Sequence, residues 1–167
     1  MTLPSEVWLR GPIDGIEPLL QPAAHALIQA VEDVIAVVKD LRAEQLWARP
    51  CGVAAIGFHI AHLSGSVDRL LTYSRGEGLS EAQFAVLSAE RAVHENRPDL
   101  ASLLENLTDT IDAALAYLRT VTRESLLTPR EVGRKRLPST ILGLIFHAAE
   151  HSSRHAGQVV TLATVVK

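Results

Sequence analysis

Hydrophobic residues recur along most of this chain with the period of an α-helix. Between residues 22 and 41 they stand three or four positions apart, while Glu32, Asp33 and Lys39 occupy other positions. Pro22 is compatible with a helix because it lies in the opening turn, where its missing N–H is not needed. A first helix is therefore predicted over residues 22–41. Its apolar stripe consists of Ala24, Leu27, Ile28, Val31, Val34, Ile35 and Val38.

The same period predicts three more segments of helix. Residues 47–52 contain a proline and a glycine and predict a turn, after which residues 53–73 form the second helix. Ser80 and Gln83 resemble a capping box, which predicts a shorter helix that ends near residue 95. A proline and an aspartate then open a further helix, predicted over residues 98–121.

The last helix is predicted over residues 140–165, with Ser139 as its N-cap. Residues 123–138 are the least regular internal stretch, and no alternation typical of a β-strand is evident in the chain. This stretch includes a basic cluster beside prolines and a glycine, which we interpret as a solvated connector rather than a phosphate-binding patch. The cluster consists of Arg130, Arg134, Lys135 and Arg136.

These segments predict one all-α domain. The 167 residues fit a single compact core. Residues 1–20 are rich in proline and glycine and are expected to form an irregular N-terminal arm, and residues 21–167 form the helix-bundle domain. Hydrophobic residues make up 47% of the chain but aromatic residues only 4%, which suits closely packed helices better than a β-sandwich.

Charge and composition argue against several classes of protein. The net charge of −3 and the few aromatic residues disfavour a nucleic-acid partner. Cys51 is the only cysteine, which excludes an intrachain disulfide and any multi-cysteine zinc site. The N-terminus lacks the pattern of a signal peptide, and no apolar run reaches the roughly 20 residues that span a bilayer. We therefore expect a cytoplasmic protein without a membrane partner.

Three histidines in the last predicted helix carry the strongest chemical signal. His147, His151 and His155 stand four residues apart and share one helix face. Two such neighbours can bind one metal ion at about 2.0–2.1 Å per nitrogen, but the outer two are about 12 Å apart along the axis. A metal site therefore needs one neighbouring pair and a ligand from another helix, for which His59 and His62 are candidates. The alternative is that these are core histidines hydrogen-bonded to backbone groups.

Two segments resemble the DinB superfamily, the damage-inducible, YfiT-like helix bundles. Residues 57–76, GFHIAHLSGSVDRLLTYSRG, resemble the helix with the first ligand histidine of that family. Residues 147–158, HAAEHSSRHAGQ, resemble its closing H-x-x-x-H-x-G-Q signature. The likeness in helix order and spacing extends over roughly residues 20–165, and these two segments are its specific part.

The resemblance assigns the metal ligands residue by residue. It places them on His62, His151 and His155. His59 fits the first position in part, but His62 is preferred because the small and charged residues 65–69 follow it at the distance usual in the family.

The resemblance also implies a fold and a range of activities. Similar proteins are antiparallel four-helix bundles with a long crossover, and the short helix before residue 95 would be an addition to the four. They bind nickel or zinc, and iron is a further candidate because it also accepts imidazole ligands. They are often homodimers. They are regarded as metal-dependent hydrolases, and some transfer low-molecular-weight thiols to electrophiles. We therefore expect a small-molecule substrate, with such a thiol among the candidates.

Three protein ligands leave coordination positions open, which favours an enzyme over a purely structural metal site. The chain contains neither H-E-x-x-H nor G-x-S-x-G, so the sequence identifies no catalytic residue. The alternative is a non-catalytic binding or stress-response module that the metal stabilises.

Several further residues are candidates for a place at the site. Gln158 follows His155 by one turn and is a candidate to hydrogen-bond a ligand imidazole, with a solvent-facing amide as the alternative. His59 and His147 are candidates to line the pocket, with core packing as the alternative. Cys51 is interpreted as an inert packed residue.

Two charged residues near His62 and two further histidines are given no chemical role. Asp68 and Arg69 are interpreted as packing or interface residues, and His25 and His94 have no partner pattern.

Overall fold

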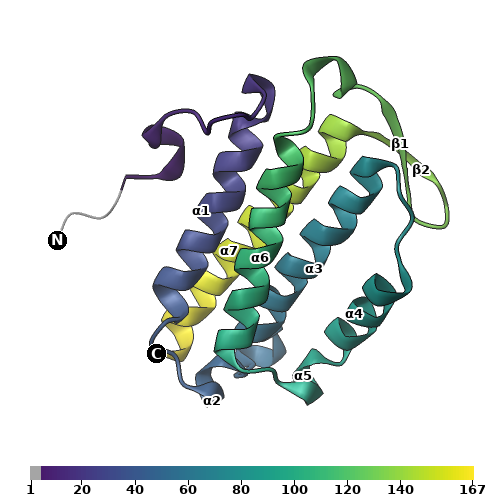
Figure 1. Ribbon diagram of the computed structural model, residues 1–167. Helices are drawn as coiled ribbons and strands as arrows, with labels where there is room; N and C mark the ends of the chain where they lie inside the picture. The colour runs from purple at the N-terminus through teal and green to yellow at the C-terminus, as the bar shows by residue number, and fades with distance from the viewer. Residues whose placement is uncertain (1–4) are drawn as a thin grey trace.

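The computed structural model describes residues 5–167, which form a bundle of four long helices (Figure 1). These are α1 (Gln21–Val38), α3 (Ile56–Arg75), α6 (Leu100–Leu118) and α7 (Ile141–Val166). Helix α7 packs along both α3 and α1, and α6 packs along α3. The predicted all-α fold is therefore confirmed.

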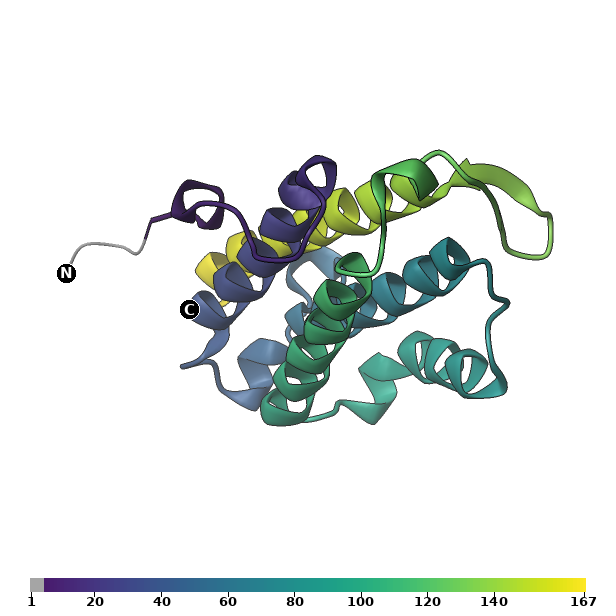
Figure 2. The ribbon, with the colours of Figure 1, turned by 45° about the horizontal axis from the view of Figure 1, so that its top comes forward.

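A long crossover sets the direction of the helices. In Figure 1, α3 and α6 run in the same direction, and α1 and α7 run the opposite way. The chain returns from the end of α3 to the start of α6 through α4 (Glu81–Arg91) and α5 (Val93–Asn96). These two helices lie on the side of the bundle away from α1 (Figure 2). The short helix α2 (Ala43–Leu46) lies in the link between α1 and α3.

The apolar stripes of the four long helices meet in one core. Burial of these side chains supplies the main driving force for folding, at about 25 cal/mol for each Å² of apolar surface removed from water. Fully buried members of the core include Leu27 and Val34 of α1, Ile60, Leu63 and Val67 of α3, Leu107 and Leu118 of α6, and Ile145 and Val159 of α7.

The helix ends follow local hydrogen-bonding rules. The predicted capping box of α4 is present: the Ser80 hydroxyl accepts from the Gln83 N–H at 3.2 Å, and the Gln83 side chain accepts from the Ser80 N–H at 2.9 Å. The predicted N-cap of α7 is wrong by one residue. Thr140 rather than Ser139 caps the helix, because its hydroxyl accepts from the Gly143 N–H at 3.0 Å.

Residues 123–140 are more regular than the sequence indicates. They contain an antiparallel hairpin of β1 (Pro129–Val132) and β2 (Leu137–Thr140). Four residues per strand are too few to show a clear period of two, so the pattern gave no sign of it. Arg130 of the basic cluster is also more than a solvated charge, because its Nε donates to the Ser74 carbonyl at 2.7 Å and ties the hairpin to the end of α3.

Residues 5–20 lie against α1 and include two short 3-10 turns, Val7–Arg10 and Pro18–Leu20. Val7, Ile16 and Leu20 are buried there. Residues 1–4 of the predicted arm lie outside the described residues. Within residues 5–167, none of the helices has the length and apolar character needed to cross a membrane.

Candidate metal centre

Helices α3 and α7 bring the predicted histidines together. His59 and His62 are three residues apart on α3, and His151 and His155 are four apart on α7, so each pair projects from one face of its helix. Close packing of α3 along α7 makes these two faces meet. His59 is buried, with 6% of its surface exposed, and the other three are partly buried.

His62, His151 and His155 each offer a ring nitrogen, and the three nitrogens lie within 4.8 Å of one another. The Nε2 atoms of His62 and His151 are 3.0 Å apart. Two nitrogens bound to one ion at about 2.0–2.1 Å stand roughly 2.9–3.4 Å apart, according to whether the geometry is octahedral or tetrahedral. The side chains present therefore fit a transition-metal ion, and among the described residues this is the one such group of ligand side chains.

His59 lies beside the three rather than replacing one of them. Its Nδ1 is 2.9 Å from Nδ1 of His155. If His155 binds a metal through Nε2, its Nδ1 carries the proton and can donate to His59. His59 thus supports the orientation of the His155 ring.

A carboxylate from the crossover completes the cluster. Glu90 of α4 is 8% exposed, and its Oε1 lies 2.6 Å from Nδ1 of His62. Its other oxygen accepts from Arg69 of α3 at 3.0 Å. Sequence reasoning missed Glu90 and interpreted Arg69 as a packing or interface residue, because no periodic or motif signal links a residue of α4 to the histidines.

A row of aromatic rings borders the cluster. The ring of Phe58 stacks with both His62 and His94, at centroid distances of 5.5 Å and 5.6 Å. Trp47 meets His94 edge-on at 6.1 Å. His94, which had no expected role, is therefore part of the wall next to the candidate site.

The model of the DinB superfamily matches residues 5–159. The chain belongs to the DinB superfamily. This confirms the resemblance seen in the two histidine segments. A search among curated proteins returned no match.

The other predicted residues occupy different positions in the DinB bundle. His147 is exposed rather than packed in the core, and its Nδ1 lies 2.7 Å from Glu150. Gln158 is exposed, as in the solvent-facing alternative. His25 lies 3.0 Å from the Gly11 carbonyl, away from the cluster. Cys51 is exposed, contrary to the expected packed position.

Burial favours the neutral form of three imidazoles of this DinB protein, those of His59, His151 and His155. Loss of solvent, reinforced by the neighbouring His62 and His151 rings, lowers the pKa of His155 to about 3. Burial likewise lowers the pKa of His151 and of His59 below the ordinary value for histidine. Neutral imidazoles keep the lone pairs that a metal ion needs.

Glu90 is ionised despite its burial. Burial alone raises the pKa of its carboxyl, but the hydrogen bonds from His62 and Arg69 outweigh this effect and hold the pKa below its ordinary value. A carboxylate accepts hydrogen bonds and cannot donate them, so Nδ1 of His62 carries a proton. When this ring is neutral, its Nε2 lone pair faces His151.

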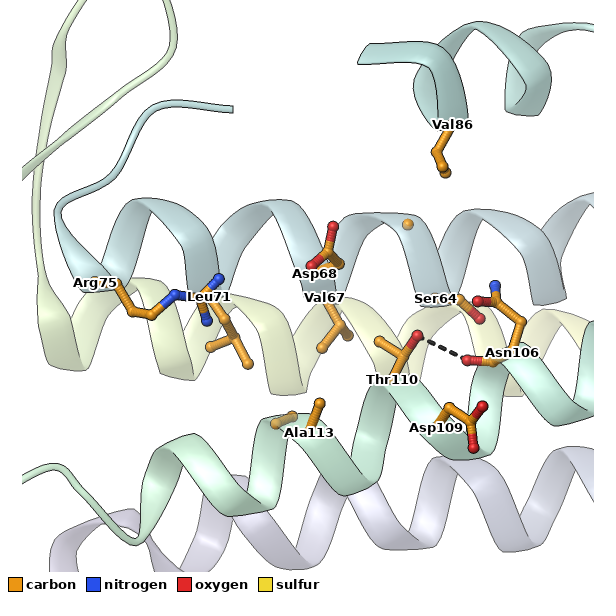
Figure 3. Close-up of a pocket in the computed structure, with 12 residues that line it drawn as sticks. Ser64, Val67, Asp68, Leu71, Arg75, Val86, Asn106, Asp109, Thr110 and Ala113 are labelled. Carbon is orange, nitrogen blue, oxygen red and sulfur yellow. Dashed lines mark hydrogen bonds between the residues drawn. The ribbon is translucent and has the colours of Figure 1, made fainter. Parts of the chain in front are cut away.

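A separate cavity of about 320 Å³ lies between α3, α6 and α4 (Figure 3). Asp68 and Arg75 of α3 and Asp109 of α6 line it, with Val86 of α4 across from them. None of the clustered histidines lines this cavity. The candidate metal ligands therefore lie on the face of α3 that meets α7, apart from this cavity.

Proposed function

We propose that this protein binds one divalent transition metal through His62, His151 and His155 and uses it to catalyse a reaction of a small molecule. The observation that carries the proposal is the meeting of three ring nitrogens within 4.8 Å of one another, with the pKa of His155 lowered to about 3. Membership of the DinB superfamily supports it. Nickel and zinc are the metals we expect, and iron is also compatible.

The ligand set favours catalysis over a structural role. A structural zinc site in a protein normally has four protein ligands, whereas three leave a position for water or substrate. His59 is not counted as a fourth ligand, because its Nδ1 is the hydrogen-bond partner of Nδ1 of His155. A metal ion bound here would supply Lewis acidity, which lowers the pKa of water or of a thiol and polarises an electrophile.

The proposed reaction is either metal-dependent hydrolysis or transfer of a low-molecular-weight thiol to an electrophile. In both, His62, His151 and His155 hold the reacting centre in place, and Glu90 and His59 hold the ligand rings. His147 is exposed beside His151, with the two ring centroids 5.5 Å apart, and its Nδ1 is paired with the partly buried Glu150. This pair is our candidate for accepting a proton from the nucleophile.

Metal analysis of tag-free protein tests the first half of the proposal. We expect about one nickel, zinc or iron ion per chain in the wild type, and loss of that ion in His151→Ala. His147→Ala is the matched control, since it removes a histidine from the same helix that lies outside the three, and it should retain the metal. A wild type that binds none of these metals would refute the proposal.

Activity assays test the second half. The metal-loaded protein is offered a thiol together with an electrophile, and in parallel a panel of activated esters and amides. Turnover that disappears in a folded His151→Ala variant supports the enzyme. Stoichiometric metal with no turnover, together with a large fall in melting temperature on chelation, would instead indicate the non-catalytic, metal-stabilised module.

The oligomeric state is a further part of the proposal. We propose a homodimer on the basis of the family resemblance. Sedimentation velocity distinguishes a dimer from a monomer of this chain.

A further inference from the structure

Helix α4 carries one buried side chain, and that side chain is Glu90. The rest of α4 is exposed or partly exposed, including Phe84 and Val86. A buried carboxylate is strongly unfavourable unless it is paired, because it has lost its contact with water. The structure pairs both of its oxygens, one with His62 and one with Arg69.

Helix α3 leaves space for this carboxylate at Gly65. A Cβ atom added to Gly65 would lie 2.6 Å from Oε2 of Glu90 and 2.6 Å from a guanidinium nitrogen of Arg69. Such distances are far inside van der Waals contact, so alanine would displace both groups. The small residue therefore lets a charge from the crossover reach a histidine on the inner face of α3.

We propose that Glu90 is the positioning residue of the metal centre: it fixes the ring of His62 and keeps the proton on Nδ1, so that Nε2 faces His151 as a ligand. The inference rests on the proposed metal function and adds to it the residue that prepares the first ligand. Metal-bound histidines commonly donate their other N–H to a carboxylate, which orients the ring and raises its basicity. Arg69 in turn holds the carboxylate.

A purely structural role for Glu90 makes a different prediction. In that case Glu90 would merely attach α4 to α3, as Gln83 does through its hydrogen bonds to Asp68 and Thr72 at 2.7 Å each. Gln83→Ala therefore loosens α4 without touching a histidine. It is the matched control for Glu90→Ala.

The protonation pattern of His62 tests the proposal without any metal. Nitrogen-15 NMR of the metal-free wild type should show the proton on Nδ1 of His62. Glu90→Gln keeps an acceptor oxygen and should preserve this pattern, whereas Glu90→Ala should shift the proton toward Nε2 or give a mixture. An unchanged pattern in Glu90→Ala would overturn the proposal.

Zinc affinity, measured by competition with a chromophoric chelator, provides the second test. We expect Glu90→Ala to bind zinc about 10- to 100-fold more weakly than the wild type. Glu90→Gln should lie between the two, and Gln83→Ala should match the wild type. Equal losses in Gln83→Ala and Glu90→Ala, or no loss in either, would overturn the positioning role.

The same titrations separate this inference from the metal function itself. Absence of zinc binding in the wild type contradicts the proposed function. Tight binding in the wild type that Glu90→Ala retains contradicts only the role of Glu90. If Glu90→Ala does not fold, Glu90→Gln provides the test. A wild-type NMR pattern together with a wild-type zinc affinity would contradict the need for a charged carboxylate. A weaker zinc affinity would support it.

Discussion

At the scale of single residues, the site depends on imidazoles that stay neutral because they are withdrawn from water. His59, His151 and His155 all have a lowered pKa, with burial as the leading cause. A neutral ring can bind a metal through one nitrogen and donate a hydrogen bond from the other, whereas a charged ring has a proton on both nitrogens and can only donate. Burial thus suits the cluster for metal binding and makes it sensitive to acid.

The metal-free protein should lose stability as the pH falls below about 6.5. In the unfolded chain, histidine takes up a proton at about that pH, but His155 in the folded chain resists protonation down to about 3. Between these values the unfolded state binds more protons, so the free energy of unfolding decreases as the pH decreases. Urea midpoints at about pH 7.5 and about pH 5 measure this loss. His155→Asn should lose less stability between these two pH values than the wild type does. Identical urea midpoints of the wild type at the two pH values would contradict the expectation.

Gly57 is the residue at which added bulk should be least tolerated. A Cβ at this position would lie 2.5 Å from Cη2 of Trp47, and a buried indole ring cannot bend away. Gly57→Ala should therefore lower the free energy of unfolding by about 1–3 kcal/mol. Gly157→Ala is the control, because nothing lies within 4 Å of its added Cβ and alanine is the better helix former. Chemical denaturation that shows Gly57→Ala as stable as Gly157→Ala would contradict this.

At the scale of elements, the four long helices could be predicted from their apolar stripes and α4 from its capping box. The four-residue helix α2 could not be predicted, because it is too short to show a repeated stripe. The i, i+4 pair His151 and His155 could be placed on one face from spacing alone, because helix geometry fixes it. The family motif was needed to choose His62 over His59, since both lie on the face that meets α7. Glu90 could not be predicted, because its partner is 28 residues away across a crossover whose path the sequence does not specify.

Gly65→Ala should weaken metal binding even though it favours the helix. Alanine stabilises a helix interior by about 1 kcal/mol relative to glycine, but here it would displace the Glu90 carboxylate from His62. We expect a loss of zinc affinity smaller than the roughly 10- to 100-fold loss expected for Glu90→Ala. Chelator competition measures it, with Gly157→Ala as the matched control. A wild-type affinity in Gly65→Ala would show that the carboxylate can adapt to the added methyl group.

At the scale of the whole molecule, the candidate metal joins two helices that are distant in the sequence. His62 lies on α3 and its two partners lie on α7. His62 and His151 are 89 residues apart along the chain. A ligand that binds only the folded state stabilises it by mass action. The metal should therefore act on the entire fold as well as on the site.

Zinc added to metal-free protein should raise its melting temperature. The gain in stability is about 2.7 kcal/mol when free zinc is at 100 times its dissociation constant. His147→Ala should show the same shift as the wild type, whereas His151→Ala should show almost none. Thermal scans with and without zinc measure this, and equal shifts in the two variants would place the metal elsewhere.

The row of rings next to the cluster has a practical consequence. The chain has two tryptophans, of which Trp8 is 62% exposed and Trp47 is connected to His62 through His94 and Phe58. In a Trp8→Phe protein, all indole emission would come from Trp47. Cobalt and nickel quench nearby indole fluorescence by energy transfer to their d–d transitions, whereas zinc has a filled d shell and does not. The protein thus contains its own optical reporter, which can follow loading and distinguish one metal from another without any added dye.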